Sequence, residues 1–465
     1  MLPAAILAAT LLVCGVLDAQ PLMLTVDPSV RHQTLVGYGQ GSMDQRNPVW
    51  YREVTPAGRE ELLDLLYTLK GKGLGWNICR TYICAGDAEG HAHFNRRPGG
   101  ALNPLGYEPQ DGLFTWEGHE ISLWHCQGAA ARGCRMVAFF NSPPAWMTVS
   151  GCTAGSVDGK TDNLRAGMEP RFAQYMCDVL AHYRDAWGID FEFISPINEP
   201  EADWWKAGGG QDGCHVGVEQ AKRIIRELRA ELDRRGMPTR IQAYEAAYTN
   251  ASWYLDALLA DPQVAACIDT LTCHQYIVSE GALRTWARRA REAGKELWMS
   301  EWGDWTNRGL RLAMNYATHL HQAHRVLQTP VWCVWEPGFL LEAKGDEVRP
   351  NKAFYAVGQF TRFARPGDVA VEVGSAPAAM TTAYLREAGK LLTLVAVNPT
   401  EQAQEVRYEL SAFDSPGPAH LWRTSATEDL AQLPDVGVGE GLALALTLPP
   451  QSVTTAVVPY GGLRR

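Results

Sequence analysis

Short runs of β-branched and aromatic residues alternate with helix-like stretches over residues 35–363. In each helix-like stretch the apolar residues return every three or four positions, as on one face of a helix. The eight strand-like runs are Leu35–Gly39, Trp76–Ile83, Arg135–Asn141, Phe191–Ile197, Arg240–Glu245, Ile268–Tyr276, Glu296–Trp302 and Val331–Trp335. Eight strand–helix units of this length predict an α/β fold, a (β/α)₈ TIM barrel.

A doubly wound open sheet is the competing α/β architecture. Such a sheet would carry a glycine-rich phosphate loop directly after its first strand. The segment "GYGQGSMDQ", Gly37 to Gln45, lacks the G-x-G-x-x-G spacing, and no helical pattern follows it at once. The barrel is therefore favoured.

The hydrophobic pattern changes after about Pro366. The segments "VAVEV", "TTAYLR", "LLTLVAVN", "EVRYEL", "ALALTL" and "SVTTAVVP" alternate apolar and polar positions and are separated by Gly, Pro and Asn. This pattern predicts an appended β-sandwich over residues 364–465. Residues 20–34 contain one more strand, "LMLTVDPSV", which we expect to join this C-terminal β-domain.

Residues 1–19 have the pattern of a secretory signal peptide. Their apolar stretch, Leu2–Leu17, falls short of the roughly 20 residues that span a membrane, and the small residue Ala19 suits a cleavage site. Cys14 offers lipoprotein anchoring as an alternative. The segment predicts a secreted or periplasmic protein without stable membrane insertion.

The composition is that of a globular protein, 46% hydrophobic and 20% charged. A formal net charge of -10, with no long basic run, argues against nucleic acid as a partner, because phosphate binding needs clustered Lys and Arg. A neutral polymer is a better partner than an anionic one, and we expect a monomer.

The chain has 11 cysteines, but they form no C-x-x-C pair and no zinc-type array with histidines. The sequence therefore implies no metal and no organic cofactor. Cys152 and Cys214 lie in glycine-rich loops, where an exported protein could join them by a disulfide.

Two glutamates close strand-like runs at matching positions. Glu199 ends the fourth run in "SPINEP", and Glu301 ends the seventh in "WMSEWGDW". Working residues of a TIM barrel lie at the C-terminal ends of its strands, and a pair of carboxylates is the minimal requirement for glycoside hydrolysis. A non-catalytic carbohydrate-binding protein on the same scaffold is the alternative, but it would not need a matched acid and nucleophile.

The segments "SPINEP" and "MSEWG", with "NSPPAWM" at the third strand and "CHQY" at the sixth, resemble glycoside hydrolase family 30. The resemblance covers essentially the whole mature chain, including "SVTTAVV" as the last strand. It implies a retaining (β/α)₈ hydrolase with a side β-sandwich. Glu199 would be its acid/base and Glu301 its nucleophile.

The same resemblance implies substrate-binding roles around the two glutamates. Arg80 and Asp87 in "CRTYICAGD" match a polar pair of the family, and Trp146 and Trp335 match aromatic walls of the subsite for the reacting sugar. Asn198 would hydrogen-bond a sugar hydroxyl.

His274 and Tyr276 are two residues apart, so both side chains should point to the same face of a strand. Tyr276 would hydrogen-bond the nucleophile and His274 a sugar hydroxyl. Trp204 and Trp205, in the glycine-rich "EADWWKAGGGQDGCH", would form a platform for sugars.

That loop and "SGCTAG" resemble the endo-β-1,6-galactanase branch of the family. The sequence therefore leads us to expect an endo-glycosidase acting on β-1,6-galactan side chains of arabinogalactan. β-1,6-Glucanase, xylanase and glucosylceramidase-like specificities remain alternatives.

Overall fold

The structure is a computed structural model that describes residues 20–41, 52–86, 106–277 and 279–464. The predicted signal peptide with Cys14, and the candidate site residue Asp87, lie outside these ranges. Within the ranges, no helix combines the length and the apolar character needed to cross a membrane.

Eight parallel strands form a closed barrel in chain order. They are β2 (Gly37–Gln40), β3 (Ile78–Ile83), β4 (Arg135–Phe140), β5 (Phe193–Ser195), β6 (Arg240–Tyr248), β7 (Thr270–Ile277), β8 (Glu296–Glu301) and β9 (Val331–Val334). The first and last strands pair and close the ring, with Gly37 opposite Val331. Strands such as β3 are buried along their whole length, as expected where helices cover the outside of a barrel and side chains fill its inside. The predicted TIM barrel is confirmed.

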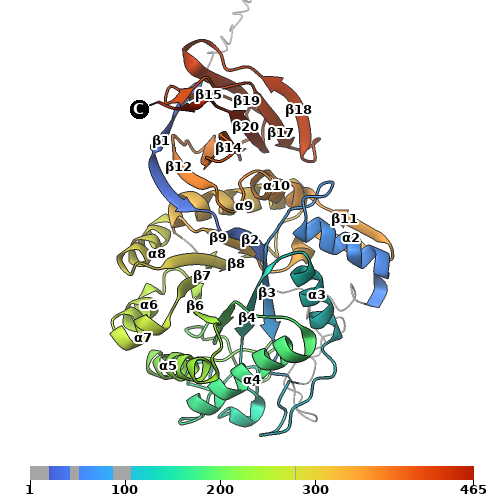
Figure 1. The fold of residues 1–465 in the computed structure, drawn as a ribbon, viewed down its shortest axis with the longest axis vertical. Helices are drawn as coiled ribbons and strands as arrows, with labels where there is room; N and C mark the ends of the chain where they lie inside the picture. The colour runs from blue at the N-terminus through green and yellow to red at the C-terminus, as the bar shows by residue number, and fades with distance from the viewer. Residues whose placement is uncertain (1–19, 42–51, 87–105, 278, 465) are drawn as a thin grey trace, which may run out of the picture.

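Helices cover the barrel between successive strands (Figure 1). They are α2 (Pro56–Tyr67), α3 (Glu120–Ala131), α4 (Glu169–Trp187), α5 (Val218–Arg235), α6 (Ser252–Leu259), α7 (Pro262–Cys267), α8 (Glu280–Glu292), α9 (Gly309–Gln322) and α10 (Lys352–Thr361). In α5, Ile224, Leu228 and Leu232 are buried on one face. Gly236 follows in the left-handed conformation, which a residue without a Cβ adopts most easily, and it ends the helix.

The barrel interior is filled in layers. Near the N-terminal ends of the strands, Phe193 and Trp298 belong to a small apolar cluster of inward-facing residues. A second cluster contains Phe139 and Trp335. The guanidinium of Arg80 lies 3.5 Å from the centroid of the Phe139 ring. The polar residues described below therefore rest on a packed apolar floor.

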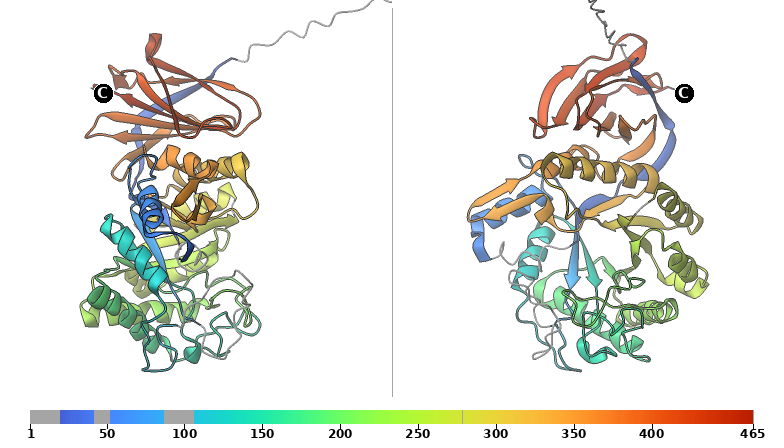
Figure 2. Two further views of the ribbon diagram at one scale, coloured as in Figure 1. Left: turned by 90° about the vertical axis from the view of Figure 1, so that its right-hand side faces the viewer. Right: turned by 180° about the vertical axis from the view of Figure 1, so that it is seen from behind.

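The C-terminal strands form a β-sandwich that lies against one side of the barrel in both views of Figure 2. They are β12 (Val369–Val373), β13 (Met380–Arg386), β14 (Leu391–Asn398), β15 (Gln404–Glu409), β17 (Ala419–Thr424), β18 (Ala431–Val436), β19 (Ala443–Leu448) and β20 (Ser452–Pro459). Strand β1 (Leu22–Thr34) pairs with β15 through its first residues and with β12 through its later ones, so it joins the two layers.

Helices α9 and α10 lie between the barrel strands and the sandwich (Figure 1). Lys352 of α10 donates to the carbonyl oxygen of Ser425, and Thr455 Oγ1 of β20 bonds to Gln359 of the same helix. These buried or half-buried contacts hold the sandwich to the barrel.

The predicted disulfide between Cys152 and Cys214 is wrong, because both cysteines are buried free thiols. The Cys214 side chain packs in the main apolar core, where burial raises the pKa of its thiol to about 12. Only the thiolate attacks in disulfide chemistry, so this thiol is unreactive. Hydrogen bonds order the Cys152 turn instead, with the Cys152 carbonyl accepting from Asn163 Nδ2 at 3.0 Å.

Candidate active site

The backbone of Glu199 is held in an unusual conformation just beyond the end of β5. Its φ of 51° lies in the left-handed region, which costs a residue with a side chain about 1–3 kcal/mol. Three hydrogen bonds fix it: its N–H donates to the Glu245 carbonyl at 3.0 Å, and its carbonyl accepts from the Ala202 N–H and the Trp205 indole. The carboxyl group therefore has a rigid base.

Irregularities in two neighbouring strands bring further side chains to the same place. On β6 the pairing with β7 shifts between Ala243 and Ala246, and Glu245 within this interval has a φ of 57°. The pairing of β7 with β8 shifts just before His274, which lies opposite Glu301. Such bulges rotate side chains relative to a regular strand, and here they occur where three functional groups converge.

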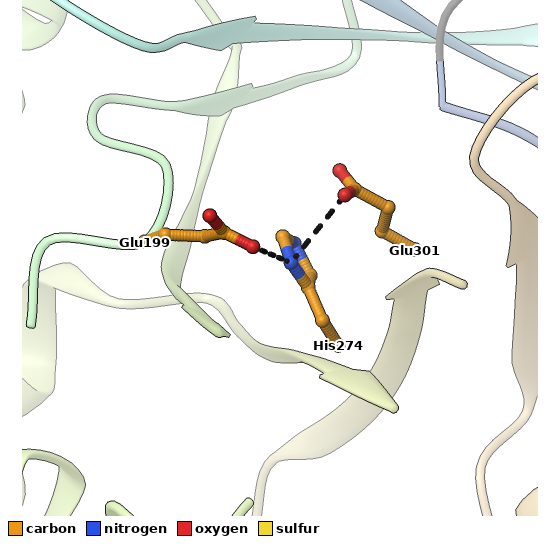
Figure 3. Close-up of side chains that lie close together, drawn as sticks. All are labelled: Glu199, His274 and Glu301. Atoms are coloured by element: carbon orange, nitrogen blue, oxygen red, sulfur yellow. Dashed lines mark hydrogen bonds and ion pairs between the residues drawn. The ribbon is translucent and has the colours of Figure 1, made fainter. Parts of the chain in front are cut away.

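The imidazole of His274 lies between the carboxylates of Glu199 and Glu301 (Figure 3). Its Nδ1 is 2.9 Å from Glu199 Oε1 and 3.6 Å from Glu301 Oε1. One oxygen from each carboxylate and a ring nitrogen all lie within 4.8 Å of one another. The two glutamates predicted from the sequence are thus close neighbours.

Two donors orient the carboxylate of Glu301. Arg80 Nη1 donates to Oε2 at 2.9 Å, and the Tyr276 hydroxyl donates to Oε1 at 2.7 Å. The other end of the guanidinium donates to Asn198 Oδ1 at 2.7 Å. Arg80 is only 1% exposed, so this network is rigid and largely dry.

A third carboxylate, Glu245, completes the cluster and was missed by the sequence interpretation. It is fully buried and accepts hydrogen bonds from the hydroxyls of Ser195 and Ser300. Its Oε2 also lies 3.4 Å from Arg80 and 3.3 Å from His274 Nε2. The available signal was its position at the end of the fifth strand-like run, the place that singled out Glu199 and Glu301.

Both ring nitrogens of His274 face carboxylates, which favours the doubly protonated imidazolium. Burial works against a charged ring, but the three surrounding carboxylates outweigh it and raise the pKa of His274 to about 10. The contact of His274 with a sugar hydroxyl stays a prediction, and the contacts seen here are with carboxylates. The ring is wholly buried, and both of its nitrogens are already engaged.

The carboxyl of Glu199 is held toward its neutral form. Burial raises the pKa of Glu199 above its ordinary value, and the negative charge of Glu301 adds to this, while His274 works in the opposite direction. For Glu245, burial is outweighed by Arg80 and His274, which hold its pKa at about 2. The site therefore combines a carboxyl poised to carry a proton with one that stays ionised.

Among the described residues, Glu199, His274 and Glu301 form the one group of three side chains that could offer ligand atoms to a metal ion. Each of these ligand atoms already has a protein partner. Both oxygens of Glu301 accept hydrogen bonds, and both nitrogens of His274 donate to carboxylates. A charged imidazolium has no lone pair for a metal, so the donor set does not fit one.

Comparison with known proteins identifies the family. The family model described as O-glycosyl hydrolase family 30 matches residues 25–285. The chain belongs to glycoside hydrolase family 30. It is therefore a glycoside hydrolase, and retention of anomeric configuration is a general property of that family.

Relatives in family 30 differ in their substrates. An endo-β-1,6-galactanase of Hypocrea rufa is 24% identical over 427 residues, 85% of this chain and 84% of the relative. The glucuronoxylanase XynC of Bacillus subtilis strain 168 is 24% identical over 449 residues, 94% of this chain and 91% of the relative. A family 30 endoxylanase structure from Clostridium papyrosolvens C71 has a TM-score of 0.72 at 22% identity, covering 94% of this chain and all of that one, which supports the fold.

The other residues predicted for this family 30 site divide into two groups. Tyr276 and Asn198 lie in the network around Glu301 and Arg80, as described above. Trp335 is only 6% exposed and packs in the apolar cluster beneath it. Trp146 is half-buried, donates its indole N–H to the Glu108 carbonyl at 3.0 Å and carries a guanidinium on its ring. The positions of both tryptophan rings are therefore fixed by protein contacts.

The two tryptophans of the predicted platform, Trp204 and Trp205, differ in exposure. Trp205 is 6% exposed, and its indole N–H donates to the Glu199 carbonyl. A Cβ on Gly213 would lie 2.0 Å from the Trp205 ring, and one on Gly155 would lie 2.0 Å from its carbonyl. The glycines of these loops therefore allow Trp205 to pack. Trp204 is 38% exposed, with the Tyr248 ring 5.2 Å away, and remains available.

Replacing Glu245 by Gln is expected to lower kcat on the order of 10²-fold, because the amide NH₂ would face His274 and Arg80, two donors that the carboxylate now holds in place. Breaking this buried charge network should also lower the free energy of unfolding by about 3–5 kcal/mol at neutral pH. Ser300→Ala, which removes one hydrogen bond, should cost only about 1 kcal/mol.

The acid dependence of unfolding separates a charge effect from a packing effect. The ionised Glu245 carboxylate stabilises the folded protein, because its pKa is lower in the folded than in the unfolded chain. This contribution is complete above the pKa of Glu in the unfolded chain, about 4.3, and is lost as the pH falls toward 2. We expect the free energy of unfolding, measured by chemical denaturation, to fall less between pH 6 and pH 2.5 for Glu245→Gln than for the wild type. Equal losses, with an unchanged kcat, would contradict the positioning role.

Proposed function

We propose that this chain is an exported endo-glycosidase that hydrolyses β-1,6-galactan side chains of arabinogalactan. Glu199 is the general acid/base and Glu301 the nucleophile. The observation that carries the roles is the approach of the two carboxylates, whose nearest oxygens lie within 4.8 Å. Retaining enzymes hold their carboxyl groups about 5–5.5 Å apart, whereas inverting enzymes leave about 6.5–9.5 Å for a water.

In the first step the proton of the Glu199 carboxyl moves to the glycosidic oxygen. The bond from that oxygen to the anomeric carbon breaks while an oxygen of Glu301 bonds to the same carbon. The leaving sugar departs as an alcohol, and an ester joins the remaining sugar to Glu301. Arg80 and Tyr276 hold the attacking carboxylate in place during this step.

In the second step Glu199 acts as a base. Ester formation removes the negative charge of Glu301, which is one of the groups that raise the pKa of Glu199. The pKa of Glu199 therefore falls, and its carboxylate can take a proton from water. The water oxygen attacks the anomeric carbon, the ester bond breaks, and Glu301 is released with the product configuration retained.

Support for the galactan branch comes from the loop after Glu199 and from the relatives. The loop that carries Trp204 resembles the galactanase branch, and the Hypocrea rufa relative is an endo-β-1,6-galactanase. The xylanase relative keeps xylan as the main alternative. Export rests on residues 1–19 alone.

A product profile on β-1,6-galactan, β-1,6-glucan, glucuronoxylan and glucosylceramide tests the proposal. We expect oligosaccharides of mixed length from β-1,6-galactan early in the reaction, with the β-anomer seen first by NMR. Activity confined to another member of the panel would reassign the branch and leave Glu199 and Glu301 in place. Binding without hydrolysis of any member would favour the non-catalytic alternative.

The two neighbouring tryptophans should respond differently to substitution. Trp204→Ala removes an exposed ring and should weaken hydrolysis of β-1,6-galactan oligomers by a factor that corresponds to about 1 kcal/mol, with less effect on an aryl monosaccharide. Trp205→Ala removes a packed ring and should lower the free energy of unfolding by about 3–5 kcal/mol. Kinetics on both substrates, with thermal unfolding of both variants, check this. Equal kinetic losses for Trp204→Ala on the two substrates would count against a platform.

A further inference from the structure

The loop between β8 and α9 carries an exposed tryptophan, Trp305, four residues after Glu301. Trp305 is 48% exposed, although its neighbours in the loop, Trp302 and Asp304, are buried. The roles derived above leave this ring unassigned. Its surroundings show that it is a fixed part of the active-site rim.

Hydrogen bonds hold the backbone on both sides of Trp305. The carboxylate of Asp304 accepts from the N–H groups of Thr306 and Asn307 at 2.9 and 3.0 Å, and from Asn315 Nδ2 of α9 at 2.7 Å. Both oxygens of this carboxylate thus accept hydrogen bonds from the loop itself or from α9. Because the backbone is already ordered, little further entropy would be lost when a ligand binds the ring.

Close packing fixes the other side of the loop. A Cβ on Gly303 would lie 2.6 Å from the Phe339 ring, so the loop backbone lies directly on that ring. Phe339 meets Trp305 edge to face, with ring centroids 5.3 Å apart. It also packs on the apolar cluster that contains Trp335. Trp305 therefore has a firm apolar base and leaves about half of its surface exposed.

Trp305 is one side chain away from the reacting groups. Its ring centroid is 5.4 Å from that of Tyr276. The hydroxyl of Tyr276 donates in turn to Glu301 at 2.7 Å. A sugar lying on Trp305 would therefore be a close neighbour of the sugar that reacts at Glu301.

A second exposed ring lies on the same loop as Glu199; we call the loop after each barrel strand, with the end of that strand, a sector of the active-site rim. Trp204 follows Glu199 in the loop beyond β5, and its ring lies 5.2 Å from that of Tyr248 at the end of β6. Trp305 belongs to the β8 sector, as Glu301 does. Each of the two reacting glutamates is thus accompanied by an exposed tryptophan from its own sector.

We propose that Trp305 is a stacking platform for a neutral pyranose unit of the substrate, next to the sugar that reacts at Glu301. A tryptophan face suits the apolar C–H face of a pyranose. The carboxylate of the preceding residue, Asp304, has its acceptors occupied by protein donors, so it does not select a charged sugar. With Trp204 in the β5 sector and Trp305 in the β8 sector, the bound chain extends to both sides of the cleavage point. The inference rests on the proposed function in that its ligand is a β-linked oligosaccharide.

Binding to an inert enzyme tests the platform without turnover. In a Glu301→Gln background, calorimetry with β-1,6-galacto-oligosaccharides of one to five units should show that Trp305→Ala weakens the longer ligands roughly three- to tenfold. The loss should grow with chain length, and Trp305→Phe should recover most of the affinity. Trp422→Ala is the matched control, because it removes a half-buried ring from β17 of the sandwich, which contacts the Phe363 ring at 4.4 Å between centroids.

The dependence of the loss on ligand length decides whether Trp305 binds sugar. Equal weakening at every length, monosaccharide included, would mean that Trp305 only supports Tyr276, and would overturn the platform. Unchanged affinity would overturn it as well. Repeating the titration with β-1,6-gluco- and xylo-oligosaccharides separates the platform from the galactan assignment. If a gluco- or xylo-oligosaccharide binds and the galacto-oligosaccharides do not, the galactan assignment fails. The platform is then judged by how the loss of affinity depends on the length of the sugar that binds. If no oligosaccharide binds, both fail.

Discussion

Glu301→Gln is expected to lower kcat/KM by about 10⁴-fold or more on every substrate that the wild type hydrolyses. An amide cannot form the ester intermediate, so the loss should not depend on how good the leaving group is. Steady-state kinetics on an activated aryl glycoside and on the polysaccharide measure it. Glu296→Gln is the matched control, because Glu296 lies at the opposite, exposed end of the same strand β8 and should keep full activity.

Covalent labelling gives an independent test of the same residue. A mechanism-based fluoro-sugar should accumulate as an ester on Glu301, and peptide mass spectrometry of the trapped enzyme should find it there. A label on Glu199 or Glu245 would reverse the proposed roles. An early product of inverted configuration by NMR would reject the two-step mechanism altogether.

The sequence was sufficient for the barrel, because buried parallel strands appear as short continuous apolar runs between amphipathic helices. Strands β17 and β18 of the sandwich were missed. β18 lies at the edge of its sheet and contains Pro434, a residue that normally argues against a strand and is tolerated only where a backbone N–H need not pair.

The sequence indicated those site residues whose place follows from their position along a strand, and not those whose place depends on packing between distant segments. Strand ends identified Glu199 and Glu301, and the resemblance to family 30 implied the hydrogen bond from Tyr276 to Glu301. The bulge at Glu245 and the burial of Trp205 depend on contacts between distant segments, such as the close approach of a loop glycine to the indole ring. No local pattern encodes such contacts. Glu245 also ends a strand-like run, but its place between Arg80 and His274 and the burial of Trp205 became evident only in the folded chain.

Glu199→Ala should have an effect that depends on the leaving group. Loss of general acid catalysis costs about 10²–10⁴-fold where the departing sugar needs a proton. An aryl glycoside with an acidic phenol leaves without protonation, so its first step should be almost unaffected and the ester on Glu301 should accumulate. Azide can attack that ester without a base, so it should restore turnover and give a β-glycosyl azide, which NMR can identify.

The pH profile of the same variant tests why Glu199 carries the proton. Burial and the charge of Glu301 raise the pKa of Glu199, so the wild type should stay active to higher pH than an ordinary carboxyl allows and then decline as Glu199 loses its proton. Glu199→Ala should lose this alkaline decline on the activated substrate. Glu192→Ala, at the start of the same strand-like run, should keep it, because Glu192 is paired with Arg135 and Arg240 at the far end of the barrel. An unchanged alkaline decline in Glu199→Ala, without rescue by azide, would assign the acid to another residue.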